Sequence, residues 1–325
     1  MNSQRPGAIW IGSERKYSHE IGVVWIGNAC AWNPAALRSA YELVIKSWSD
    51  AGLAPHRLAA SAPGVGRKYG AFDRKRRFVE RADFNKVGTI EMVRIQPGCT
   101  SEMSDWEMEA TLSQKLGMFS AGCVLSLVGD AASFIEQNAL NLFELSGCRY
   151  GWMFRQRLRF SPGAYAFGLT VHVDDDPRHD DHRKNIQSWH PSIERLGPTV
   201  DAGILRDVFA ENYLAWPHLE ASLGNTATTL KQWIEADRAS RGTLEPYTDI
   251  LTKWTPPVEK IPQIREELYR AGRVFYWQFF RPPGANRLPG PFFRPDLSAP
   301  WEAPDPIPEI YRADYWKDKD PGLTY

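Results

Sequence analysis

The chain has few cysteines, no net charge and no long apolar run, and each of these shortages excludes a class of protein. Four cysteines among 325 residues, without a CxxC pair, argue against a zinc site or a dense disulfide framework and favour reduced thiols. Equal numbers of basic and acidic residues, 39 of each, argue against a dedicated nucleic-acid binder. No apolar run approaches the roughly 18 residues of a membrane helix, and the N-terminus lacks a signal-peptide pattern. We therefore expect a cytoplasmic protein that contacts neither membranes nor nucleic acid directly.

Sequence motifs for catalysis are also lacking. There is no GxSxG nucleophile elbow, and no cysteine has a histidine beside it in the sequence. The stretch 64–70 (GVGRKYG) resembles a phosphate-binding loop only superficially, because the full GxxxxGK[ST] pattern is missing and no periodic helix follows. We interpret that stretch as a turn, and we expect neither catalysis nor a cofactor.

What the chain does have is the composition of a folded protein and clear local patterns. Hydrophobic residues make up 43% of it, enough for a sizeable core. Asn33-Pro34 is a typical helix start and Gly52 a typical stop, while Asp130 and Gly147 bracket a second helix in the same way. The predicted strands and helices of this part are, in chain order, strand 21–26, helix 34–51, strand 89–95, strand 120–128 and helix 131–146.

The clearest local signal lies between residues 149 and 174. Tyr150, Trp152, Phe154, Leu158 and Phe160 share one face at period two, and the alternation resumes at 165–173 after the turn Ser-Pro-Gly. This pattern predicts a long antiparallel hairpin. Its outer face would carry an arginine ladder, formed by Arg155, Arg157 and Arg159.

The second half repeats the mixture of helices and strands. Predicted helices lie at 201–213, 229–237 and from 262, with strands at 249–254 and 273–280. The predicted fold class is therefore α+β, with antiparallel sheets and packed helices. The order helix, glycine, aromatic strand recurs, which allows two similar α+β halves. Ten of the 24 prolines fall in 281–325, which predicts an extended arm packed on the body. The predicted division is 1–190, 191–280 and 281–325.

The segment 171–190 (VHVDDDPRHDDHRKNIQSWH) combines acidic and imidazole side chains at high density. Four of the seven histidines fall within it. Such a cluster could hold a divalent metal, which would suggest a hydrolase, or it could be a solvated acidic loop that contacts a basic partner. Pro177 interrupts the run and no Glu is placed as a general base, so the contact loop is the favoured interpretation and no metal is expected.

Two basic clusters allow a weaker hypothesis. The arginine ladder could contact phosphates, which would make the protein a nucleic-acid-binding accessory. The zero net charge favours a solvated or carboxylate-paired face instead. The run 73–77 (DRKRR) is likewise predicted to be a solvated loop.

Several of these segments together resemble the immunity protein 52 family, whose members are antidotes to bacterial polymorphic toxins. The residues that carry the resemblance read IGVVWIGNACAWNPAAL, YGWMFRQRLRFSPGAYAFG, LRDVFAENYL and LKQWI. It extends over most of residues 20–280 and rests on pattern and order rather than on a sharp motif. Membership would imply an α+β protein without catalysis that binds and neutralises a nuclease toxin, as in type VI secretion systems.

The acidic segment agrees with that implication, because a nuclease that engages DNA tends to present a basic surface. An acidic loop can imitate the phosphate backbone and steer association. The expected toxin-contacting residues are Asp174, Asp175, Asp176, Asp180 and Asp181, with Trp189 as an apolar anchor. The alternative function is a metal-dependent hydrolase that uses the Asp/His cluster of residues 172–190.

Overall fold

The computed structural model divides the chain into two compact units, residues 1–166 and 167–325. It describes residues 8–11, 14–17, 19–27, 32–61, 69–95, 106–114, 117–124, 129–157 and 200–275. The predicted domain limits at 190 and 280, the second hairpin strand and the proline-rich arm lie outside these residues and stay predictions. Among the described helices, none is both long enough and apolar enough to cross a membrane.

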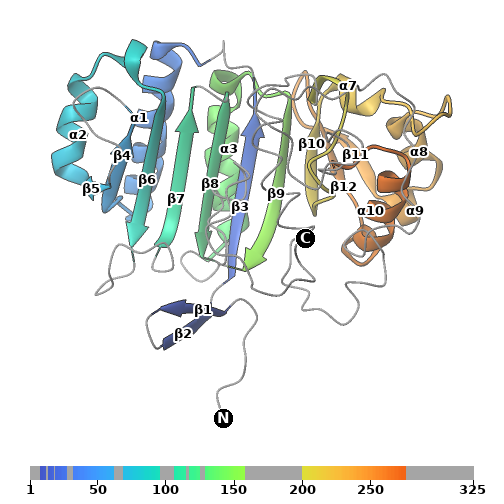
Figure 1. The fold of residues 1–325 in the computed structure, drawn as a ribbon, viewed down its shortest axis with the longest axis horizontal. Helices are drawn as coiled ribbons and strands as arrows, with labels where there is room; N and C mark the ends of the chain where they lie inside the picture. The colour runs from blue at the N-terminus through green and yellow to red at the C-terminus, as the bar shows by residue number, and fades with distance from the viewer. Residues whose placement is uncertain are drawn as a thin grey trace, which may run out of the picture. The chain divides into compact units, whose positions relative to one another are not determined.

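The first unit has two layers, an antiparallel sheet and the helices that pack on it (Figure 1). A separate hairpin, β1 (Ala8–Ile11) with β2 (Glu14–Tyr17), precedes it. In spatial order, the described strands of the main sheet in this unit are β9 (Tyr150–Arg157), β3 (His19–Ile26), β8 (Met118–Val124), β7 (Trp106–Ser113), β6 (Thr89–Ile95), β4 (Arg57–Ala60) and β5 (Gly70–Ala71). The predicted antiparallel α+β class is confirmed.

One face of this sheet is an apolar floor for the helices. Residues paired directly across antiparallel strands share a face, so the register shows row by row which residues face the helices. One row crosses five strands and is fully buried; it consists of Trp25, Phe119, Leu112, Ile90 and Ala60. Helix α3 (Ala131–Ser146) packs on β3 and β8, and Phe143 meets the Trp25 ring edge-on at 6.1 Å. This face therefore contains the hydrophobic core of the first unit.

The two long helices begin and end where the sequence predicts. In α1 (Pro34–Asp50), the Asn33 side chain accepts from the backbone N–H of Ala36, and Gly52 follows with a φ of 71°. Asp130 accepts from the N–H of Ser133 at the start of α3, which ends at Gly147 with a φ of 55°. Both helices lie on the same face of the sheet and pack against each other (Figure 1).

The basic run 73–77 is helical, so the prediction of a loop there is wrong. It lies in α2 (Phe72–Arg81), followed by the short 3-10 helix η2 (Phe84–Lys86). Phe72 and Val79 are seven residues apart, which places them on one face of a helix, and both are buried against the end of the sheet. Two apolar contacts are thus enough to hold a segment that is otherwise highly charged.

The second unit is smaller in its described part. Three antiparallel strands lie in the order β11 (Thr243–Pro246), β12 (Thr252–Thr255), β10 (Glu211–Leu214). Its helices are α7 (Trp216–Leu219), α8 (Leu230–Ala236), α9 (Arg238–Arg241), the 3-10 helix η5 (Val258–Lys260) and α10 (Ile261–Arg270). The predicted helices near 229 and 262 and the strand near 252 are confirmed.

The predicted helix over 201–213 is wrong, because its residues find other hydrogen-bond partners. Leu205 forms a parallel bridge with Val274, with its N–H donating to Arg273 O and its carbonyl accepting from Phe275 N–H. The Asn212 side chain accepts from the N–H of Phe209 and donates to the carbonyl of the same residue. A buried Asn that satisfies a turn removes those groups from a helical ladder, and the chain then enters β10.

Candidate functional site

The residues predicted from the sequence to contact a partner are not among those that the structure describes. Asp174, Asp175, Asp176, Asp180, Asp181 and Trp189 all lie outside the described residues. The same holds for the side chains of the arginine ladder, although the backbone of Arg155 and Arg157 belongs to β9 and pairs with β3. No group of three or more metal-ligating side chains occurs in the described parts of the chain. Those parts nevertheless contain two candidate sites that sequence reasoning missed.

The first candidate is the face of the unit 1 sheet that points away from α1 and α3. The register places Ser120 opposite Thr111, and Thr111 opposite Glu91, in one row. Ser120 and Thr111 are buried, as are Ser113 and Glu109 further along β7. Buried polar side chains on a sheet face are unusual, because each must regain the hydrogen bonds it lost with water. We name Glu91, Glu109, Thr111, Ser113 and Ser120 the polar face.

A tyrosine is coupled to the polar face. Tyr69 Oη donates a hydrogen bond to Glu91 Oε2 at 2.5 Å, and the Tyr69 ring meets Trp106 edge-on at 5.5 Å. Burial, the negative charge of Glu91, the hydrogen bond to Glu91 and the charge of Glu109 together raise the pKa of Tyr69 far above its usual value. The phenol therefore stays protonated at neutral pH. In this form it donates its hydrogen bond to Glu91.

Aromatic side chains continue this face toward β9. Trp152 pairs with Val24, which pairs in turn with Ser120, so Trp152 lies in the same row as the polar residues. Tyr150, Trp152 and Phe154 are all buried, and the Tyr150 and Trp152 ring centroids are 5.1 Å apart. The predicted common face of these three aromatics is confirmed by the pairing of β9 with β3. The face thus combines an aromatic end with a polar middle.

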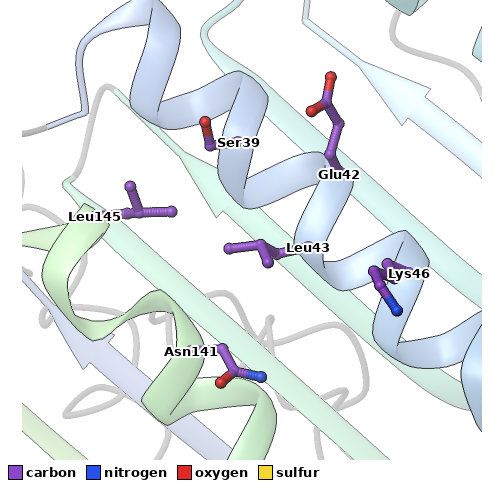
Figure 2. Close-up of a pocket in the computed structure, with 6 residues that line it drawn as sticks. All are labelled: Ser39, Glu42, Leu43, Lys46, Asn141 and Leu145. Atoms are coloured by element: carbon purple, nitrogen blue, oxygen red, sulfur yellow. The ribbon is translucent and has the colours of Figure 1, made fainter.

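The second candidate is a groove between α1 and α3, shown in Figure 2. It has a volume of about 520 Å³. The Leu43 and Leu145 side chains point toward one another across it, while Asn141 approaches from α3 (Figure 2). Its lining residues are Ser39, Glu42, Leu43 and Lys46 of α1 and Asn141 and Leu145 of α3. Leu43 is 37% exposed, so an apolar side chain of a partner could bury it.

The chemistry of this groove suits binding better than catalysis. Lys46 is ion-paired with Asp50 one turn further along α1, and Asn141 accepts a hydrogen bond from Gln137 on α3. Neither helix places a histidine, cysteine or second carboxylate in the lining to activate Ser39. The groove therefore offers an apolar floor with a polar rim, which is the composition of a small protein-contact site.

Among the described residues of the second unit, the most buried charged contact joins a helix to a loop. Arg265 of α10 is 3% exposed, and its Nε lies 2.6 Å from Asp207 Oδ1. The same carboxylate oxygen accepts from the N–H of Val208, and Arg265 also reaches the Val208 carbonyl at 3.5 Å. These contacts fasten α10 to the loop before β10. Removing one partner of such a pair would leave an uncompensated buried charge and destabilise the unit.

Comparison with known proteins gives a structural neighbour but no family. No protein-family model matches the sequence, and no curated protein matches it. The structure is similar to that of a Pseudomonas aeruginosa T6SS protein, PA0821, with a TM-score of 0.48 and 12% sequence identity. The match covers 89% of this chain and 86% of that chain. At that score and identity, the likeness carries no argument about function.

Proposed function

We propose that this protein is an immunity protein that neutralises a nuclease toxin of a type VI secretion or polymorphic-toxin system. It would act in the cytoplasm by binding the toxin at equal stoichiometry, without catalysis of its own. The resemblance of residues 20–280 to the immunity protein 52 family supports this proposal, and the α+β fold with antiparallel sheets agrees with what that resemblance implies.

The observation that carries the proposal is the clustering of five aspartates within eight positions, 174–181, in a chain without net charge. A surface that binds DNA is basic, because it must neutralise phosphates. A cluster of carboxylates competes for the same surface and accelerates encounter with it. Trp189 would add the apolar contact that a charged rim needs for affinity.

The groove between α1 and α3 provides support from the described residues. Interfaces combine an apolar centre with polar groups around it, and the lining of this groove has that composition, with Leu43 and Leu145 beside Glu42 and Lys46. Its volume of about 520 Å³ exceeds that of any single side chain, so a partner would insert several side chains there. The toxin would thus make two separable contacts, an electrostatic one with the acidic segment and an apolar one with the groove.

The test uses the product of the reading frame adjacent to this gene, purified as a separate protein. We expect it to degrade DNA alone and to lose that activity when the full chain is added at equal concentration. Reversing Asp174, Asp175, Asp176, Asp180 and Asp181 to lysine should weaken binding roughly tenfold or more. Unchanged affinity would contradict a role for the acidic segment, and continued DNA degradation in the presence of the wild-type chain would contradict neutralisation itself.

A matched control changes the net charge equally but elsewhere. It reverses five exposed carboxylates of the second unit to lysine, namely Asp201, Glu235, Glu245, Asp249 and Glu259. This control should retain toxin binding, because long-range charge alone is screened at physiological salt. Elemental analysis of the purified chain provides a further check. One tightly held zinc or manganese per chain would favour the metal-dependent hydrolase and contradict the proposal.

A further inference from the structure

Helix α2 presents an exposed face of arginines around a phenylalanine. Arg74, Arg77, Phe78 and Arg81 follow the spacing i, i+3, i+4 and i+7, which places them on one side of a helix. All four are exposed, and 53% of the Phe78 surface is accessible. We name these four residues the α2 face.

The cations of the α2 face are not used within the described structure. Arg76, on a neighbouring side of the helix, is ion-paired with Glu80 at 2.5 Å, and this contact raises its pKa. Among the described residues, no ion pair involves Arg74, Arg77 or Arg81. The helix therefore neutralises one arginine and leaves three available.

The helix does not depend on a partner for its position. Phe72 and Val79 are buried, and α2 packs on β4 and β5 at the end of the unit 1 sheet (Figure 1). Tyr69, just before the helix, is fixed to β6 through Glu91. An interaction surface on a preformed element loses little conformational entropy when it binds.

We propose that the α2 face docks a protein segment that carries carboxylates around a large apolar side chain. Arginine forks match carboxylates in two-bond geometry, and three of them lie around one aromatic ring. Arginine and aromatic residues are the side chains that most often dominate the energy of protein interfaces. This surface shares no residue with the acidic segment or the groove, and its positive charge suits an acidic segment of a partner.

An acidic protein segment fits this face better than nucleic acid does. Asp73 and Glu80 lie on the same helix, so a continuous phosphate backbone would meet negative charge that a short segment with discrete carboxylates can avoid. The chain has no net positive charge to attract one from a distance. Phe78 gains most from an apolar partner, because its burial removes exposed hydrocarbon from water.

The experiment selects a displayed library of short random peptides on the immobilised full chain. Enriched peptides should combine aspartate or glutamate with an aromatic or long aliphatic residue. Replacing Arg74, Arg77 and Arg81 together with glutamate should weaken the best peptide at least roughly tenfold, and Phe78→Ala about fivefold. A second triple variant with glutamine in place of glutamate should also lose binding. Urea unfolding should show that these exposed changes leave the fold intact.

Two matched controls separate the α2 face from general charge effects. Arg76→Ala with Glu80→Ala removes a pair from the same helix without changing net charge, and Lys231→Glu reverses an exposed lysine in the second unit. Both should retain peptide binding. Peptides that bind the triple variant as well as the wild type would overturn the proposal. So would a short single-stranded DNA that binds the α2 face more tightly than any peptide and competes it away.

Discussion

Helices α1 and α2 belong to the same unit but differ in how many of their residues are buried. Six residues of α1 are buried, including Leu37, Tyr41 and Trp48, and a side-chain cap from Asn33 begins it. Only Phe72 and Val79 of α2 are buried, and no side chain caps its start at Ala71. Helix α1 is therefore anchored by a whole buried face, whereas α2 is anchored by two side chains and leaves most of its surface to solvent or a partner.

The difference shows how a chain with balanced charge can separate folding from recognition. Apolar area removed from water drives the packing of a helix, and it scales with the number of residues buried. The remaining surface of α1 is exposed, at residues such as Arg38 and Asp50 as well as at Leu43 in the groove with α3. Substitutions of the buried α1 residues should consequently change stability, and substitutions of the exposed α2 residues should change binding. The four predictions below test this contrast, in order of decreasing effect.

The largest effect is expected for Trp48→Ala in α1. Trp48 is 1% exposed, so the substitution removes a whole buried ring and leaves a cavity. It should lower the free energy of unfolding by about 3–5 kcal/mol, measured by urea titration followed by tryptophan fluorescence or circular dichroism. A loss below about 1 kcal/mol would show that α1 is not the anchor that its burial indicates.

Val79→Ala should cost less, because α2 has few apolar contacts and loses one of them. The substitution removes two buried methyl groups, and we expect a loss of about 2 kcal/mol in the free energy of unfolding. Hydrogen exchange should show faster opening of α2 than of α1, since one of only two buried α2 residues is weakened. Equal protection of both helices in the variant would contradict the contrast between them.

Asn33→Ala tests the cap that α1 has and α2 lacks. The Asn33 side chain accepts from the Ala36 N–H at 2.9 Å, and its loss should destabilise the protein by about 1 kcal/mol. Thermal and urea unfolding of the variant measure this directly. Asn33→Ser, which can still accept the hydrogen bond, is the matched control and should recover most of the stability.

Phe78→Ala should have the smallest effect on stability. The side chain is 53% exposed, so its removal should change the free energy of unfolding by less than about 0.5 kcal/mol. The same variant should weaken binding of the peptides selected on the α2 face. If the variant unfolds much more easily than the wild type, Phe78 is a packing residue and the assigned role of α2 fails.

Local signals in the sequence were sufficient for some elements and insufficient for others. Asn33 and Asp130 act within three residues of themselves as caps, so the starts of α1 and α3 could be predicted. The helix predicted over 201–213 failed because Leu205 pairs with residues 273–275, about 70 positions away. Helix α2 was missed because seven of its ten residues are charged and only two apolar residues, Phe72 and Val79, are buried, which is too few to show a helical period.

The candidate sites divide in a similar way. Five aspartates near Trp189 are visible in the sequence because a charge cluster is local. The polar face is not visible, because Glu91, Thr111 and Ser120 come from three separate strands. The groove likewise requires α1 and α3, about 100 residues apart, to lie side by side.

The sequence by itself determined the α+β class, the limits of both long helices, the shared face of the β9 aromatics and the acidic segment. Caps, glycine stops, alternation and charge runs act over a few neighbouring residues, so they can be recognised without knowing the fold. Only the tertiary structure decided which strands are neighbours, which sheet face is polar, where the groove lies and which side of α2 is exposed. Those properties arise when distant segments bury apolar surface together, and no local pattern records which segments will meet.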